Sequence, residues 1–110
     1  MIDKTSTTEE DEIDFGRPQD PVVARKLIHG IVDAGQVAYS KHALEEMQKD
    51  RLTPVDVVNV LRGGAVAPAE FENGSWRYRV WTQRMSVVVV IRSAIELKVV
   101  TAWKEKKGRT

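Results

Sequence analysis

The residues best suited to chemistry are basic and aromatic side chains that alternate along one segment of the chain. Arg77, Arg79 and Trp81 occupy every second position, the spacing that places side chains on one face of a β-strand. Arginine binds phosphate oxygens through paired hydrogen bonds, and an indole ring offers an exposed base a stacking surface. This pattern is compatible with nucleic-acid binding, but a solvated sheet face with one partly buried tryptophan is the interpretation that the pattern alone favours.

Two further basic residues lie at the ends of expected elements. His42 lies in the first turn of a predicted helix, and an imidazole suits general acid or base catalysis near neutral pH. Lys104 lies where the last predicted strand ends, with Lys106 nearby, and an amine there can stabilise phosphate charge in a transition state. Each has a simpler interpretation, because His42 can cap or pack its helix and Lys104 can belong to a solubilising terminus.

The remaining candidates lie near predicted turns. Arg51 follows the second predicted helix and either binds phosphate or pairs with Asp50 or Asp56. Gln83 and Arg84 lie in a turn, where they either contact a ligand or are exposed. The sequence contains no phosphate-binding glycine loop, paired-carboxylate motif or serine–histidine–aspartate signature.

Composition narrows the classes of function. The chain has no cysteine, which excludes disulfides, thiolate metal sites and cysteine nucleophiles. Its two histidines, His29 and His42, cannot form a zinc site by themselves, and we expect no metal and no cofactor. The apolar run Val87–Ile91 is far shorter than the roughly 20 residues that cross a membrane, and the acidic N-terminus is unlike a signal peptide. We therefore expect a cytoplasmic protein with no membrane partner.

The net charge of +1 conceals an uneven distribution. Residues 1–20 carry seven acids and two bases, whereas the remaining residues carry 15 bases and nine acids. An acidic tail thus precedes a basic domain, and such a domain attracts phosphate backbones. A solvated surface with a solubilising tail is the other interpretation.

Helical spacing of apolar residues and helix caps predict the first half of the domain. Residues 1–19 lack apolar periodicity, so we expect a disordered acidic tail followed by one domain over residues 20–107. Three short helices are expected, at Pro21–Ala34, from Lys41 to about Arg51, and from Pro54 to Gly63-Gly64.

The second half changes to the period of two typical of strands. Strands are expected at Ala65–Glu72, Trp76–Thr82, Met85–Ile91 and Ile95–Trp103. Asn73-Gly74 predicts a tight hairpin turn, because these residues tolerate positive φ angles. The predicted fold class is α+β, with three short N-terminal helices packed on one side of a four-stranded antiparallel sheet.

The order of several short motifs resembles that of the MqsR and RelE-type toxins. The corresponding segments are Arg25–Ile28, Ala34–Val37, Ser40–Leu44, Asn59–Leu61 and Ala102–Lys106. The chain also resembles a broader group of small domains that open with Ser-x-His-Ala-x-x-x-Met, here Ser40 to Met47, and carry an arginine before a Thr-Pro-x-x-Val helix.

The resemblance implies a RelE-like fold and the toxin of a type II toxin–antitoxin system. Such a toxin is a metal-independent endoribonuclease that cleaves mRNA, and its partner is a cognate antitoxin, often with a zinc-binding or helix-turn-helix domain. In such enzymes the ribose 2′-hydroxyl attacks the adjacent phosphate. Lys104 matches the terminal-strand lysine of MqsR, so we expect Lys104→Ala to abolish toxicity and leave the protein folded.

The candidate residues therefore fall into two groups. Those expected to be catalytic are His42, Arg77, Arg79 and Lys104, and those expected to bind substrate are Arg51, Trp81, Gln83, Arg84 and Lys106. A non-catalytic module that binds RNA or a partner protein through the same basic face is the alternative.

Overall fold

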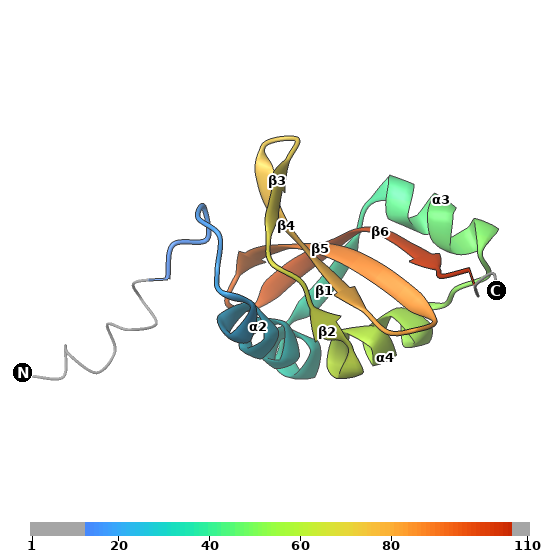
Figure 1. The fold of residues 1–110 in the computed structure, drawn as a ribbon, viewed down its shortest axis with the longest axis horizontal. Helices are drawn as coiled ribbons and strands as arrows, with labels where there is room; N and C mark the ends of the chain where they lie inside the picture. Colours follow the sequence, from blue (N-terminus) through green and yellow to red (C-terminus); the bar gives the residue numbers. More distant parts are fainter. Residues whose placement is uncertain (1–12, 107–110) are drawn as a thin grey trace, which may run out of the picture.

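The computed structural model describes residues 13–106 of the chain. The helices are α2 (Pro21–Ala34), α3 (Lys41–Lys49) and α4 (Pro54–Gly63). The strands are β1 (Gln36–Tyr39), β2 (Ala65–Val66), β3 (Glu70–Glu72), β4 (Ser75–Trp81), β5 (Met85–Ser93) and β6 (Glu96–Lys104). Figure 1 shows α2 and α4 together against one face of the sheet, whereas α3 packs against β6 away from α2.

Each helix begins at a residue whose side chain accepts a backbone N–H of the first turn. Asp20 accepts the N–H of Val22 at 2.7 Å, and Ser40 accepts the N–H of Ala43 at 2.9 Å. Thr53 begins α4 with a capping box, in which its own side chain and that of the third helical residue each accept a backbone N–H. These caps explain why all three predicted helices are present.

The predicted four-stranded antiparallel sheet is wrong. The sheet has six strands in the order β1-β6-β5-β4-β2, with β3 paired to β4, and β1 runs parallel to β6. The four residues of β1 are too few to show strand periodicity between two helices, yet they pair with the free edge of β6. The predicted first strand divides into β2 and β3 around Pro68, which has no N–H to donate to a ladder. The helices are likewise not all on one side, because α3 packs away from α2 (Figure 1).

The hairpin of β3 and β4 projects from the rest of the sheet (Figure 1). Its turn residues Asn73 and Gly74 have φ angles of 49° and 81°, as the sequence predicts for a tight turn. Phe71 and Trp76 pack edge to face on one side of the hairpin, with ring centroids 5.1 Å apart. This aromatic pair stabilises a two-stranded element that has no helix beneath it.

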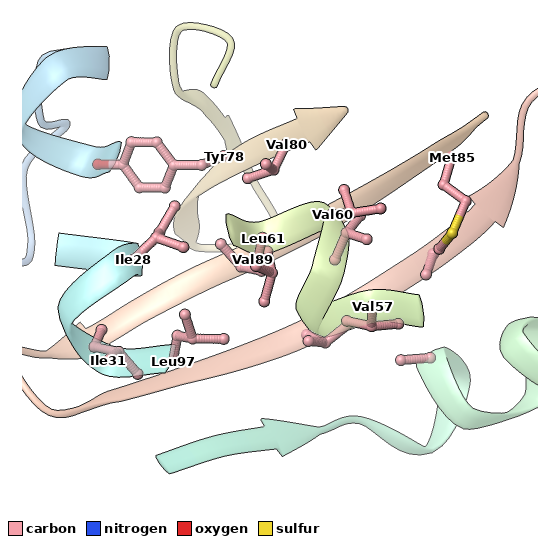
Figure 2. Packing of buried hydrophobic residues seen from close by; sticks show 14 of the residues in the cluster. Ile28, Ile31, Val57, Val60, Leu61, Tyr78, Val80, Met85, Val89 and Leu97 are labelled. Atoms are coloured by element: carbon pink, nitrogen blue, oxygen red, sulfur yellow. The ribbon is translucent and has the colours of Figure 1, made fainter. Parts of the chain in front are cut away.

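The hydrophobic core lies between the sheet and the helices α2 and α4. Figure 2 shows Ile28, Val57 and Leu61 from these helices facing side chains of β4, β5 and β6. Alternate strand residues fill the core and are almost fully buried: Tyr78, Val80, Val87, Val89, Ile91, Leu97, Val99 and Ala102. The residues between them face the opposite side of the sheet, which is called the open face below.

A β-bulge in β6 changes the alternation near the end of this strand. Val89 pairs with Val99 and Val88 pairs with Thr101, so Val100 is an extra residue with no partner of its own. Val99 and Ala102 both face the core, three positions apart rather than two. Beyond the bulge, the β6 residues that would otherwise face the core therefore face the open face, and those that would otherwise face the open face point to the core side.

The segment before α2 lies against the edge of the sheet. The backbone N–H of Gln19 donates to the hydroxyl of Tyr78 at 2.7 Å, and Phe15 packs against the core. Burial raises the pKa of the Tyr78 phenol. The part of the predicted tail before residue 13 lies outside the described residues. Within residues 13–106, no helix is long and apolar enough to cross a membrane.

Candidate nucleic-acid interface

The open face of β4 carries the alternating residues that the sequence singles out. Tyr78 and Val80 are buried in the core, so Arg77, Arg79 and Trp81 face away from α2 and α4, as predicted. The guanidinium carbon of Arg79 lies 5.7 Å from the centre of the Trp81 ring, within the range of a cation–π interaction. This contact helps to orient a guanidinium group beside an aromatic surface.

A row of aromatic residues crosses three strands of the open face. Trp81, Ser86 and Trp103 are register partners on β4, β5 and β6. Ser86 is fully buried, and its hydroxyl donates to the carboxylate of Glu105. The small serine therefore leaves the two indoles as the large side chains of this row, with Trp81 38% exposed.

A second row lies beside the first. Arg79, Val88 and Thr101 are register partners on the same three strands. The row combines one cationic, one apolar and one hydroxyl side chain, and the bulge at Val100 places Thr101 in it. A phosphate oxygen at this position would meet both a guanidinium and a hydroxyl donor.

Helix α3 adds His42 to this surface through its N-terminal cap. The hydroxyl of Ser40 donates to the carbonyl of Val100 at 3.1 Å, and the N–H of Ser40 donates to the carbonyl of Val99 at 2.9 Å. These bonds attach the first turn of α3 to the bulge. Because His42 lies in that turn, it reaches the same hollow as Thr101.

The open-face hollow is lined by residues of α3, the β3–β4 hairpin, β5 and β6, and has a volume of about 710 Å³. Its polar lining includes His42, Arg77, Arg79 and Glu70. Glu70 is the cross-strand partner of Arg77 on the hairpin. The hollow thus brings an imidazole, two guanidinium groups and two carboxylates, those of Glu70 and Glu72, to one place.

The two arginines of the hollow have no anionic partner among the described residues. Both ion pairs found within residues 13–106 join residues of the helices to one another. The Nε atom of Arg77 is buried and has no hydrogen-bond partner. An unsatisfied buried donor costs about 1–3 kcal/mol, and within residues 13–106 no hydrogen bond at Nε stabilises the position of this guanidinium group.

Most of the other candidates line a separate hollow of about 820 Å³ at the end of β6, called the end hollow below. They are Arg51, Gln83, Arg84, Lys104 and Lys106. Asp50 does not pair with Arg51 and instead accepts the backbone N–H of Lys104 at 2.8 Å. The structure therefore divides the predicted site into two parts.

Lys104 lies on the α4 side of the sheet. Its register partner is Met85, which is buried in the core. The pKa of Asp56, in the first turn of α4, is lowered chiefly by hydrogen bonds from Thr53 and additionally by the charge of Lys104. Lys104 is thus directed toward α4, whereas Arg77 and Arg79 lie on the opposite face.

Four charged, polar or aromatic residues of the open-face hollow were not identified by the sequence analysis: Glu70, Glu72, Thr101 and Trp103. Thr101 and Trp103 could have been found only by locating the bulge, because simple alternation from Leu97 and Val99 places them in the core. Glu70 and Glu72 could not be identified from periodicity, because their strand has only three residues. No group of three His, Cys, Asp or Glu residues that could hold a metal ion occurs in the part of the chain that the structure describes.

The family model "Domain of unknown function (DUF4258)" matches residues 39–104, more than half of the chain. The chain belongs to this family. In this DUF4258 member the matched segment runs from the end of β1 to the end of β6, so it contains most of both hollows. Comparison with curated proteins and with solved structures gives no match.

Proposed function

We propose that this DUF4258 protein is an endoribonuclease that binds single-stranded RNA on its open face, as the toxin of a type II toxin–antitoxin system that cleaves mRNA. One observation carries the proposal: His42, Arg77 and Arg79 line the same hollow, and neither guanidinium is paired with a carboxylate in residues 13–106. The motif order shared with MqsR-type toxins supports the same activity.

The proposed reaction is an internal transfer of the phosphodiester. The ribose 2′-oxygen bonds to phosphorus and the bond to the 5′-oxygen breaks, which leaves a 2′,3′-cyclic phosphate and a 5′-hydroxyl. One group must take the 2′-hydroxyl proton and another must protonate the leaving oxygen. His42 and Glu70 line the same hollow and are assigned these two proton transfers.

Arg77 and Arg79 are assigned the charge that develops on the phosphate. Guanidinium groups stabilise such charge without changing their own protonation. Trp81 and Trp103 lie one register row away and would stack the neighbouring bases, each contact contributing about 1–3 kcal/mol. Stacking requires unpaired bases, so the substrate is single-stranded RNA.

The end hollow receives a binding role in this proposal. Lys104 and Arg84 lie beyond the aromatic row and would contact the RNA backbone as it leaves the open face. The proposed cognate antitoxin would neutralise the toxin by covering Arg77 and Arg79.

The test is cleavage of a long transcript by purified protein in EDTA. His42→Ala and Arg79→Ala should each lower the cleavage rate about 100-fold or more, the usual effect of removing an acid–base group or a charge-stabilising donor. Arg62→Ala is the matched control, because this arginine pairs with Asp33 between α2 and α4. It should leave the rate within about threefold, since surface ion pairs contribute little.

Lys104→Ala separates the two hollows. We expect it to weaken RNA binding and to leave cleavage at saturating RNA nearly unchanged. If it abolishes cleavage whereas Arg79→Ala does not, the reaction occurs in the end hollow and the open-face assignment is wrong. Salt-sensitive binding of RNA that stays intact would instead identify a non-catalytic module.

A further inference from the structure

The open-face hollow continues into a second cationic hollow at the other end of the sheet. This adjoining hollow has a volume of about 540 Å³ and shares Arg77 and Val100 with the first. Its charged lining residues are Arg77, Arg92 and Lys98, and no acidic residue lines it. The two hollows together form one groove lined by four cationic residues, Arg77, Arg79, Arg92 and Lys98, and by two acidic ones at the hairpin, Glu70 and Glu72, so the groove is basic on balance.

The chain enters the fold at this groove. Phe15 lines the adjoining hollow and also packs against the core. The N–H of Gln19 donates to the hydroxyl of Tyr78 and attaches this segment to β4, and within the segment the N–H of Gly16 donates to the side chain of Asp14. Whatever precedes Phe15 therefore starts beside Arg77, Arg92 and Lys98.

The preceding segment is strongly acidic. Residues 1–14 contain six acids and one base, and four of the acids are consecutive, Glu9 to Glu12. An extended chain covers about 3.5 Å per residue, so Glu9 can lie up to roughly 20 Å from Phe15. Arg79 is only about 7 Å beyond Arg77 along β4, so the acidic run is long enough to follow the groove.

We propose that the acidic segment Glu9–Glu12 docks into the basic groove of its own chain and competes there with RNA. Charge complementarity and the position of Phe15 identify this segment as the occupant. The docking itself depends only on the groove, whereas the competition rests on the proposed function. Because the segment is covalently attached, it acts at a high effective concentration and restrains weak, nonspecific RNA binding.

The test uses the full chain with three charges removed from the segment, Glu9→Gln, Glu10→Gln and Glu12→Gln together. The control removes the same number of charges from helices with Asp33→Asn, Glu45→Gln and Glu46→Gln, none of which lines the groove. Amide spectra by nuclear magnetic resonance are recorded without RNA. Affinity for a labelled 12-nucleotide uridine RNA is measured by fluorescence anisotropy at low salt.

The segment variant should shift the amide signals of Arg77, Arg79 and Lys98, and 0.5 M salt should shift those of the unchanged protein the same way. Its RNA affinity should rise about threefold or more, as expected for three exposed ion pairs. Unchanged groove signals, or the same rise in the control, would overturn the proposal. Shifted groove signals with no RNA binding by any variant would support docking and contradict the proposed function.

Discussion

Replacing Gly35 with alanine tests the part of the fold that sequence reasoning missed, the junction of α2 with β1. The N–H of Gly35 donates to the carbonyl of Ile31 at 2.7 Å and closes the helix. A Cβ atom at this position would lie 2.3 Å from the carbonyl oxygen of Ile95 and 2.9 Å from its carbonyl carbon. Both neighbours are backbone atoms, so no side-chain rotation can make room.

The loss of stability in Gly35→Ala can be worked out from the backbone that must move to make room for the new Cβ atom. Relief requires the β5–β6 turn to withdraw by roughly 1 Å, and overpacking of this kind costs about 1–3 kcal/mol. The movement also loosens the bond from the N–H of Gln36 to Ile95, which is 2.8 Å long and worth about 0.5–1.5 kcal/mol. Alanine is less flexible than glycine in the unfolded chain, and this difference offsets about 0.4–1 kcal/mol of the destabilisation. Gly35→Ala should therefore destabilise the protein by about 1–3 kcal/mol.

The assay is unfolding by urea, monitored by tryptophan fluorescence and by circular dichroism. Gly30→Ala is the matched control, because Gly30 lies within α2 and a Cβ atom there meets nothing within 4 Å. That substitution should stabilise the protein by about 0.5–1 kcal/mol, since alanine favours helix more than glycine does. If Gly35→Ala is as stable as the unchanged protein, the close approach of the β5–β6 turn to Gly35 is wrong.

Two further predictions concern titrating groups. Hydrogen bonds from Thr53 are the chief cause of the lowered pKa of Asp56 in the folded protein. The ionised carboxylate of Asp56 therefore stabilises the fold at pH values above its unfolded-state pKa. This stabilisation is lost as the pH falls through the folded-state pKa. Asp56→Asn should therefore flatten the acidic limb of stability below about pH 5, and an unchanged limb in urea titrations would contradict this. Burial raises the pKa of Tyr78. The protonated phenol therefore stabilises the fold at pH values below the unfolded-state pKa of about 10, and this stabilisation is lost as the pH rises through the folded-state pKa. Tyr78→Phe should lower the free energy of unfolding by about 1–3 kcal/mol, because the N–H of Gln19 loses its acceptor, and should flatten the alkaline limb; equal stability of the two proteins at neutral pH would refute it.

The elements that could be predicted from sequence are those with local signals. Asp20, Ser40 and Thr53 are side chains that cap helices, and each begins a helix in the structure. The Asn73-Gly74 turn likewise needs only the φ preferences of its own residues. β1 could not be predicted, because its partner is more than fifty residues away and its four residues have no pattern of their own.

The site was predictable where it depends on one strand alone. Alternation along β4 places Arg77, Arg79 and Trp81 on one face, and the structure has them there. His42 joins them only because α3 packs against β6, a contact between distant segments that sequence periodicity does not encode. Nothing in the pattern of residues 20–107 shows which of the basic side chains share a hollow.

The single extra residue Val100 decides how the basic residues are divided. In an unbroken β6, residues alternating with Leu97 and Val99 would bury Trp103 and direct Lys104 to the open face, beyond the row of Trp81. The bulge instead places Trp103 on the open face and turns Lys104 toward α4. The carbonyl of Val100 in the same bulge accepts a hydrogen bond from Ser40, the cap of α3, and so brings His42 into the same hollow as Thr101. One inserted residue thus removes a lysine from the open face and supplies a histidine, and for that reason we assign one of the two proposed proton transfers to His42 and the phosphate charge to the two arginines.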